Sequence, residues 1–172
     1  MSLYPATDWS GTCGVRLYPG DDFSSGPSAA RLTPVAGGAA LALDYTWTHP
    51  ERGEQAGHLV LGRADDAGRV TASLVDSVHQ TPGVRLLSGA AGAPSSSGVG
   101  TGTGADPVAS HPIAGEGLAV DAADEDGGWT VAVRLQGGTL ALVLRTAPPP
   151  GDEGRRPEPY DVLRAAWRRT EG

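Results

Sequence analysis

The sequence is poor in several residue types, and each shortage narrows the choice of fold and function. Cys13 is the single cysteine among 172 residues, so neither an intrachain disulfide nor a cysteine-based metal cluster can form. Lysine and asparagine are missing, and all 13 basic residues are arginine. We attribute this bias to a GC-rich genome and do not interpret the arginines as a sign of phosphate recognition.

Long apolar runs are also missing, since none approaches the roughly 20 residues that cross a bilayer. Residues 1–5 have neither the basic nor the apolar segment of a secretory signal. The net charge of −7 disfavours contact with nucleic acid and anionic membranes. The arginines of Arg155–Arg169 are interrupted by Glu158 and Asp161, which is typical of a solvated strand face. We therefore expect a cytoplasmic protein without nucleic-acid or membrane partners.

Turn residues and alternating patterns are abundant. The 26 glycines and 14 prolines divide the chain into short elements and argue against a helical bundle. Between these breaks, large apolar residues alternate with small or polar ones, which is the pattern of an antiparallel strand with one buried face. The clearest alternating positions are Leu41, Leu43, Tyr45 and Trp47; Trp129, Val131, Val133 and Leu135; and Leu140, Leu142 and Leu144.

Glycine pairs mark the turns between these runs. Gly37-Gly38 and Gly137-Gly138 supply the positive φ angles that tight hairpins require. The runs and turns together predict about ten strands. Their expected bounds are Trp9–Tyr18, Arg31–Ala36, Ala39–Thr48, His58–Arg63, Arg69–Asp76, Val84–Gly89, His111–Asp121, Trp129–Leu135, Thr139–Arg145 and Tyr160–Arg169.

Strands in this arrangement either close into a barrel or form a sandwich. Closure gives every edge strand a partner, which matters here because few charged residues protect the strands. We therefore predict an all-β fold, a closed antiparallel barrel of about ten strands. A short helix over Val162–Arg168 is the alternative to a closing strand, but the alternation of Leu163, Ala165 and Trp167 favours the strand.

The whole chain, residues 1–172, is expected to form one domain. Two segments lie outside the strand scheme. The segment at about 90–110 is rich in Gly, Ser and Ala and cannot bury enough apolar surface to become ordered, so we expect a flexible loop there. A second loop, stiffened by three consecutive prolines, is expected at about 147–159.

Three segments carry a family resemblance. Trp9-Ser10-Gly11-Thr12, Tyr45-Thr46-Trp47 and 76–82 (DSVHQTP) resemble segments of an uncharacterised bacterial family with a lipocalin-like, calycin-type β-barrel. The matching order extends over most of the chain, from about Trp9 to Arg168. The resemblance implies the barrel fold and no settled activity.

The segment 76–82 also contains the most chemically interesting groups. Asp76, Ser77 and His79 are the residue types of a nucleophilic triad. In an extended segment Ser77 and His79 would share a face and Asp76 would point away, so this pattern argues against a triad. We expect Asp76 and His79 instead to anchor the bend near Thr81-Pro82 through hydrogen bonds to the backbone.

His79 ends a strand and is expected to face the barrel mouth, where an imidazole can orient a ligand. The aromatic residues either plug the interior or line a cavity, and the abundance of Ala and Gly at inner positions favours a cavity. We predict a small hydrophobic or amphipathic ligand, with no cofactor and neither catalytic nor metal-binding residues. The expected ligand-binding residues are Tyr45, Trp47, Ser77, His79, Gln80 and Trp129.

Other functions fit the same sequence. One alternative is a structural or protein-interaction barrel with a filled core, which allows for a homodimer. A second is an enzyme with His79 as acid or base, assisted by Asp76 or Gln80. A third is a haem-binding barrel, with His79 or His111 as the proximal ligand. The four histidines lack the close spacing of a zinc site.

Overall fold

The chain forms a barrel of β-strands. The computed structural model describes residues 6–49, 51–79, 83–92, 118–125, 128–147 and 158–170. Within these ranges the only helical element is the 3-10 turn Ala36–Gly38, and no helix is long and apolar enough to cross a membrane. The strands are β1 (Thr7–Val15), β2 (Ser24–Val35), β3 (Ala40–His49), β4 (Gly53–Gly62), β5 (Arg69–Asp76), β6 (Arg85–Ala91), β7 (Leu118–Ala123), β8 (Trp129–Gln136), β9 (Thr139–Thr146) and β10 (Tyr160–Arg169).

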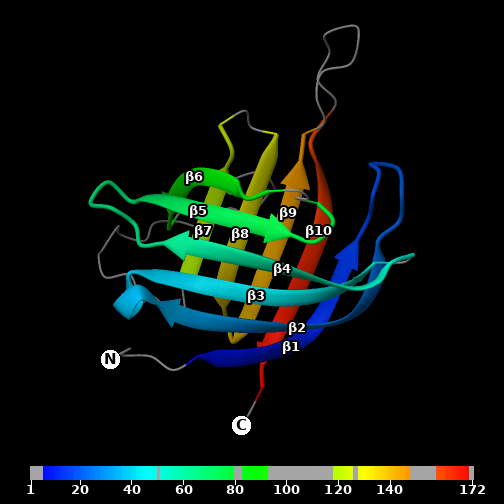
Figure 1. The fold of residues 1–172 in the computed structure, drawn as a ribbon, viewed down its shortest axis with the longest axis horizontal. Helices are drawn as coiled ribbons and strands as arrows, with labels where there is room; N and C mark the ends of the chain where they lie inside the picture. Colours follow the sequence, from blue (N-terminus) through cyan, green and yellow to red (C-terminus); the bar gives the residue numbers. More distant parts are fainter. Residues whose placement is uncertain are drawn as a thin grey trace, which may run out of the picture.

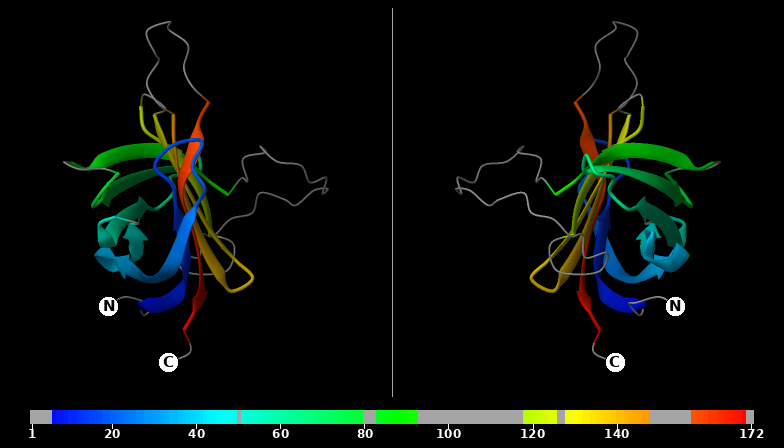
Figure 2. Two further views of the ribbon diagram at one scale, coloured as in Figure 1. Left: turned by 90° about the vertical axis from the view of Figure 1, so that its right-hand side faces the viewer. Right: turned by 90° about the vertical axis from the view of Figure 1, so that its left-hand side faces the viewer.

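Each strand pairs antiparallel with its neighbour in sequence, and β1 pairs with β10 to close the barrel. In Figure 1, β2–β5 run across the front and β7–β10 run steeply behind them. Figure 2 shows the same arrangement from the sides, with β8–β10 forming an upright wall from which β2–β5 curve away. The predicted closed antiparallel barrel is confirmed, as is the closing strand at Tyr160–Arg169.

Strands with strong alternation lie where the sequence predicts them, whereas Gly- and Pro-containing segments differ. β2 begins at Ser24, well before the expected Arg31, because its first half pairs with β1 alone and such an edge tolerates Gly26 and Pro27. β4 begins at Gly53 in place of His58, since its first residues pair with the end of β3.

Two other boundaries were predicted wrongly. β1 ends at Val15 and not at Tyr18, because the chain turns there and the Tyr18 backbone N–H donates to Asp21. β6 continues to Ala91, so the first residues assigned to the loop at 90–110 are paired strand. Residues 93–117 and 148–157, which hold the rest of that loop, the first part of the strand expected at 111–121 and most of the Pro-rich loop, lie outside the described residues.

The hairpin turns use their glycines as the sequence predicts. Gly37 and Gly38 have φ angles of 67° and 90°, and Gly137 and Gly138 have 57° and 70°. This region of φ is favourable for glycine and costly for other residues. These turns join β2 to β3 and β8 to β9.

The large members of each alternating set point into the barrel and form one hydrophobic core. The most deeply buried of these residues have no accessible surface, so no space large enough for a water molecule borders them. These residues are Leu43, Trp47, Leu59, Leu74, Val133, Leu140, Leu142, Leu144 and Leu163, each 0% exposed. The part of the interior that they line is therefore filled by side chains.

Cys13 on β1 provides a test of this packing. The thiol is 2% exposed, and burial, followed by the nearby charge of Asp76, raises its pKa to about 12. We expect iodoacetamide to alkylate native Cys13 at pH 8 more slowly, by a factor on the order of 100, than the thiol of Thr12→Cys on the outer face of the same strand. Mass spectrometry of the alkylated protein measures both rates, and urea should make Cys13 reactive. Rapid alkylation of native Cys13 would mean that water enters the barrel beside β1.

Candidate functional site

A carboxylate lies inside the barrel at the end of β5. The inward positions of this strand are Val70, Ala72, Leu74 and Asp76, so the alternation that buries three apolar side chains buries Asp76 as well. Its side chain is 0% exposed. A buried carboxylate is stable only when hydrogen-bond donors surround it.

Donors reach both oxygens of Asp76. Oδ2 accepts hydrogen bonds from the Tyr45 hydroxyl at 3.1 Å and from the Trp47 indole N–H at 3.2 Å. Oδ1 accepts the backbone N–H groups of Val78 and His79, both at 3.0 Å, and lies 3.1 Å from the His79 Nδ1. Strand β3 and the turn after β5 therefore converge on a single carboxylate.

A glycine makes room for one of these donors. Gly57 on β4 pairs with Tyr45 on β3, and a Cβ at this position would overlap the tyrosine ring. The ring packs over the glycine backbone, which lets the hydroxyl reach Asp76. An invading side chain at Gly57 would displace the tyrosine from the barrel interior.

The chain turns immediately after Asp76, which corrects one prediction. Residues 77–79 form a turn and not an extended segment, so His79 folds back onto Asp76 instead of pointing away from it. The cause is the Asp76 carboxylate itself, because it binds the N–H groups of the next residues and so bends the backbone. Asp76 anchors the turn at 77–79 through these hydrogen bonds, whereas the bend expected near Thr81-Pro82 lies outside the described residues.

His79 is enclosed by aromatic rings. Its imidazole stacks on the Trp47 indole with ring centroids 5.1 Å apart, and the Trp129 indole is tilted against it at 6.1 Å. The side chain is 7% exposed. Its Nε2 atom is buried and has no hydrogen-bond partner among the residues that the structure describes.

Trp129, the first residue of β8, is positioned by Asp124 and Arg85. Asp124 accepts the backbone N–H of Trp129 at 3.0 Å and forms an ion pair with Arg85 at 2.7 Å. The Arg85 guanidinium lies 6.0 Å from the centre of the Trp129 ring. Trp129 is half-buried, whereas Trp47 is fully buried, so the Trp129 side of His79 is the side nearer to solvent.

Asp76 carries a negative charge at neutral pH. Burial raises the pKa of this carboxyl. The hydrogen bonds and the charge interaction with His79, together with the N–H of Val78, lower the pKa by more than burial raises it, so the net pKa is below the ordinary value. Burial, and then the charge of Asp76, raise the pKa of Tyr45 well above its ordinary value. The tyrosine therefore remains a hydroxyl donor.

The structure brings four of the six expected ligand-binding residues together, namely Tyr45, Trp47, His79 and Trp129. Ser77 is exposed, and its hydroxyl donates to Gln55 and accepts the N–H of Ala56. Gln80 lies outside the described residues, as does His111, the alternative haem ligand. Within the described residues, no group of three or more His, Cys, Asp and Glu side chains could hold a metal ion.

No protein-family model, curated protein or solved structure matches this chain. The resemblance to a lipocalin-like bacterial family therefore stays a prediction.

The sequence predicts a structural role for Asp76 and does not include it among the binding residues, although Asp76 contacts Tyr45, Trp47 and His79. Two signals identify it. The alternation Val70, Ala72, Leu74 places the next inward position at Asp76, and an aspartate at a strand end commonly binds the N–H groups two and three residues on.

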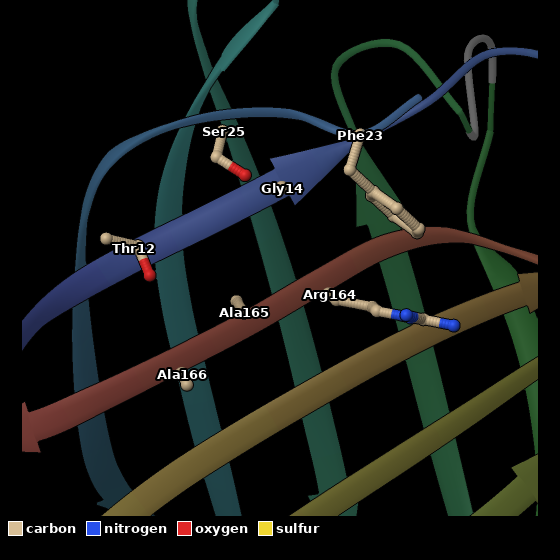
Figure 3. A pocket seen from close by; sticks show the side chains of 7 residues that line it. All are labelled: Thr12, Gly14, Phe23, Ser25, Arg164, Ala165 and Ala166. Atoms are coloured by element: carbon tan, nitrogen blue, oxygen red, sulfur yellow. The ribbon is translucent and has the colours of Figure 1, made fainter. Parts of the chain in front are cut away.

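The outer surface also has hollows. They differ from the surroundings of His79 because none of the described residues that line them has a buried polar atom without a partner. A hollow of about 320 Å³ lies over β1 and β10. Figure 3 shows the residues that line it, among them Thr12, Phe23, Ser25 and Arg164. Its charged group is already engaged, since Arg164 pairs with Asp161 at 2.7 Å and lies 4.7 Å from the Phe23 ring centre. A buried polar atom without a partner, as at His79, is not found among the described residues that line it.

Replacement of Asp76 by asparagine should destabilise the barrel. The amide nitrogen would face N–H or O–H donors, and we expect a loss of roughly 2–4 kcal/mol in the free energy of unfolding at pH 7. Because the folded pKa of Asp76 is lowered, its contribution is complete above the ordinary value of 3.8 and disappears as the pH falls through the folded pKa. The difference between wild type and Asp76→Asn should therefore be constant from pH 7 to about 5 and shrink below 3.8.

Urea unfolding across this pH range measures the difference. The matched control is Asp44→Asn, because Asp44 also pairs with a histidine, His58, but its side chain is 57% exposed. The control should change stability by about 0.5 kcal/mol or less. Equal effects of the two substitutions would contradict a special role for the buried carboxylate.

Proposed function

We propose that the protein binds a small molecule at the end of the barrel where His79 lies between Trp47 and Trp129. The observation that carries this proposal is the buried Nε2 of His79, which has no hydrogen-bond partner within the described part of the chain. A buried polar group without a partner costs about 1–3 kcal/mol. Such groups are rare in folded proteins and call for a specific explanation, and a bound partner supplies one.

The surroundings of His79 suit a ligand site. Apolar and aromatic walls with a few oriented polar groups are typical of small-molecule sites. Trp47 is fixed by its hydrogen bond to Asp76, and Asp76 also fixes the imidazole. A ligand therefore meets a preorganised wall on one side and the half-buried Trp129 on the other, and we propose that it enters on the Trp129 side.

This proposal agrees with the role expected from the sequence, a lipocalin-like barrel that holds a small hydrophobic or amphipathic molecule. The tightly packed core limits how deep the ligand reaches, because Leu43, Leu59 and Leu74 have no exposed surface. We therefore place the ligand at the barrel end and not along its axis. The cytoplasmic location and the absence of nucleic-acid and membrane partners stay predictions.

Nuclear magnetic resonance tests the proposal with three naphthalene probes of similar size, namely 1-naphthol, 1-methoxynaphthalene and 1-naphthoate. We expect at least one probe to shift the imidazole signals of His79 and the indole N–H signal of Trp129 in a saturable way. The internal control is His58, which carries the same Asp–His pairing on the outer face of β4 and should not respond. If none of the three probes shifts the His79 and Trp129 signals, the proposal is wrong.

A second candidate function is self-association through the outer face of β5 and β6. Leu86 is 74% exposed and pairs with Ser73, and Val75, on the same face of β5, is 39% exposed. Val84 adds a further side chain that is 65% exposed. Neighbouring exposed apolar side chains favour contact with a second copy of the chain.

Sedimentation velocity distinguishes this candidate. If the face mediates dimer formation, wild type should sediment as a dimer and Leu86→Glu as a monomer. The control is Ser73→Glu on the neighbouring strand, which adds the same charge without removing apolar surface and should weaken the dimer less. A wild-type protein that stays monomeric at every concentration tested would exclude the candidate.

A further inference from the structure

We infer that the ligand of this site is a neutral molecule with an aromatic or otherwise flat apolar body that donates one hydrogen bond, from an O–H or N–H group, to the Nε2 of His79. This inference rests on the proposed function and gives the chemical class of the ligand. It follows from the direction of the hydrogen bonds around Asp76 and from the position of the two indoles.

Asp76 determines which nitrogen of His79 carries the proton. The Trp47 indole and the backbone N–H groups of Val78 and His79 can only donate, and they occupy both carboxylate oxygens. A carboxylate surrounded in this way accepts and does not donate. The His79 Nδ1, 3.1 Å from Oδ1, must therefore carry a proton.

The proton on Nδ1 leaves Nε2 with a lone pair in the neutral imidazole. In the doubly protonated ring, Nε2 would instead be a buried donor without a partner on a charged group. That arrangement costs more than a buried acceptor without a partner. The Asp76 charge favours a second proton on the ring, whereas the enclosed Nε2, which has no partner among the described residues, opposes it. We assign the neutral ring, in which Nε2 is an acceptor that only a donor on the ligand can satisfy.

The same geometry disfavours two other ligand classes. A carboxylate or phosphate would bring a negative charge to a lone pair, with the Asp76 charge on the far side of the ring. An ether or ketone has only acceptors and leaves Nε2 without a partner. A site built to bind a hydroxyl or N–H group discriminates strongly against analogues that lack it.

The orientation of the two indoles indicates the shape of the ligand's apolar part. Trp47 lies nearly parallel to the imidazole, with 24° between the planes, and Trp129 is inclined by 59°. Trp129 is half-buried, whereas Trp47 is fully buried, so we infer that the ligand reaches Nε2 by displacing Trp129. A flat apolar group inserted there packs against the Trp129 face while its donor reaches His79.

The three naphthalene probes test this class because they share one ring system. The 1-naphthol hydroxyl donates, the 1-methoxynaphthalene oxygen only accepts, and 1-naphthoate is an anion. We expect 1-naphthol to bind about ten-fold or more tightly than either of the others at pH 7.5, as measured by the saturation of the Trp129 indole signal. In His79→Leu the preference for 1-naphthol should fall to about one-fold, whereas His58→Gln should keep it.

A measurement on the wild-type protein covers the case in which His79→Leu does not fold. The long-range proton–nitrogen spectrum of the imidazoles reports the protonation of each ring nitrogen. For His79 we expect a protonated Nδ1 and an unprotonated Nε2, with the Nε2 signal shifting when 1-naphthol is added. A protonated Nε2 in the free protein would overturn the inference.

The outcomes separate the two proposals. If no probe shifts the His79 and Trp129 signals, the binding site itself is refuted. If a probe binds there but 1-naphthoate or 1-methoxynaphthalene binds as tightly as 1-naphthol, the site stands and the neutral-donor class is refuted. If 1-naphthol is preferred and the preference disappears in His79→Leu alone, both proposals are supported.

Discussion

The arrangement of this barrel end depends on one buried carboxylate. Asp76 occupies an inward position of β5, where its neighbours along the strand are apolar, and it has no contact with solvent. A charge in this place requires donors from several directions. The Tyr45 hydroxyl, the Trp47 indole and the turn after β5 supply them, so one residue fixes the side chains of β3 and the path of the chain beyond β5.

The hydrogen bond to Asp76 uses one ring nitrogen of His79 and leaves the other to be considered. The imidazole donates its Nδ1–H in a hydrogen bond to the carboxylate, and the stacked Trp47 covers one face of the ring. Nε2 is then buried with no partner among its neighbours. A purely structural histidine in a tight turn would gain stability by pointing this atom to water or to a backbone N–H group. Its present position is understandable if the partner is supplied from outside the chain.

The sequence predicts the barrel well because alternation acts over whole strands. β5 and β10 begin and end as expected, and β3, β8 and β9 differ by a residue or so. The early start of β2 and β4 could not be found from alternation, since Gly26, Pro27 and Gly53 carry no such signal and are ordered by pairing with neighbouring strands. These differences arise where backbone hydrogen bonds, and not side-chain burial, define the strand.

The site was predictable in its residue types but not in its geometry. Tyr45, Trp47, His79 and Trp129 are among the ligand-binding residues that the sequence predicts, and the structure brings them together. An extended segment after Asp76, as the sequence predicts, does not allow the contact of His79 with Asp76 that the structure shows. The bend is created by hydrogen bonds of the Asp76 side chain to the following N–H groups, an effect of a single side chain that period-two analysis cannot detect.

Two Asp–His pairs in this barrel differ in burial, and burial determines whether their polar atoms need a further partner. His58 and Asp44 are separated by 2.6 Å on the outer face, with side chains 44% and 57% exposed. Water can satisfy every remaining polar atom of that pair, so it requires no further partner and contributes little to stability. The pair of Asp76 and His79 is longer, at 3.1 Å, but is enclosed, and water reaches neither carboxylate nor Nε2.

Burial therefore gives this Asp–His pair two properties that the surface pair lacks. The proton is fixed on Nδ1 of His79, and Nε2 is a fixed acceptor without a partner among the described residues. The direction of that acceptor is set by a carboxylate that cannot rotate away, because its other donors come from β3 and from the backbone. Specific recognition of a donor group needs this combination of fixed orientation and low polarity. In this barrel the combination arises because β5 continues its alternation for one more inward position after Leu74, so that Asp76 takes a place in the core.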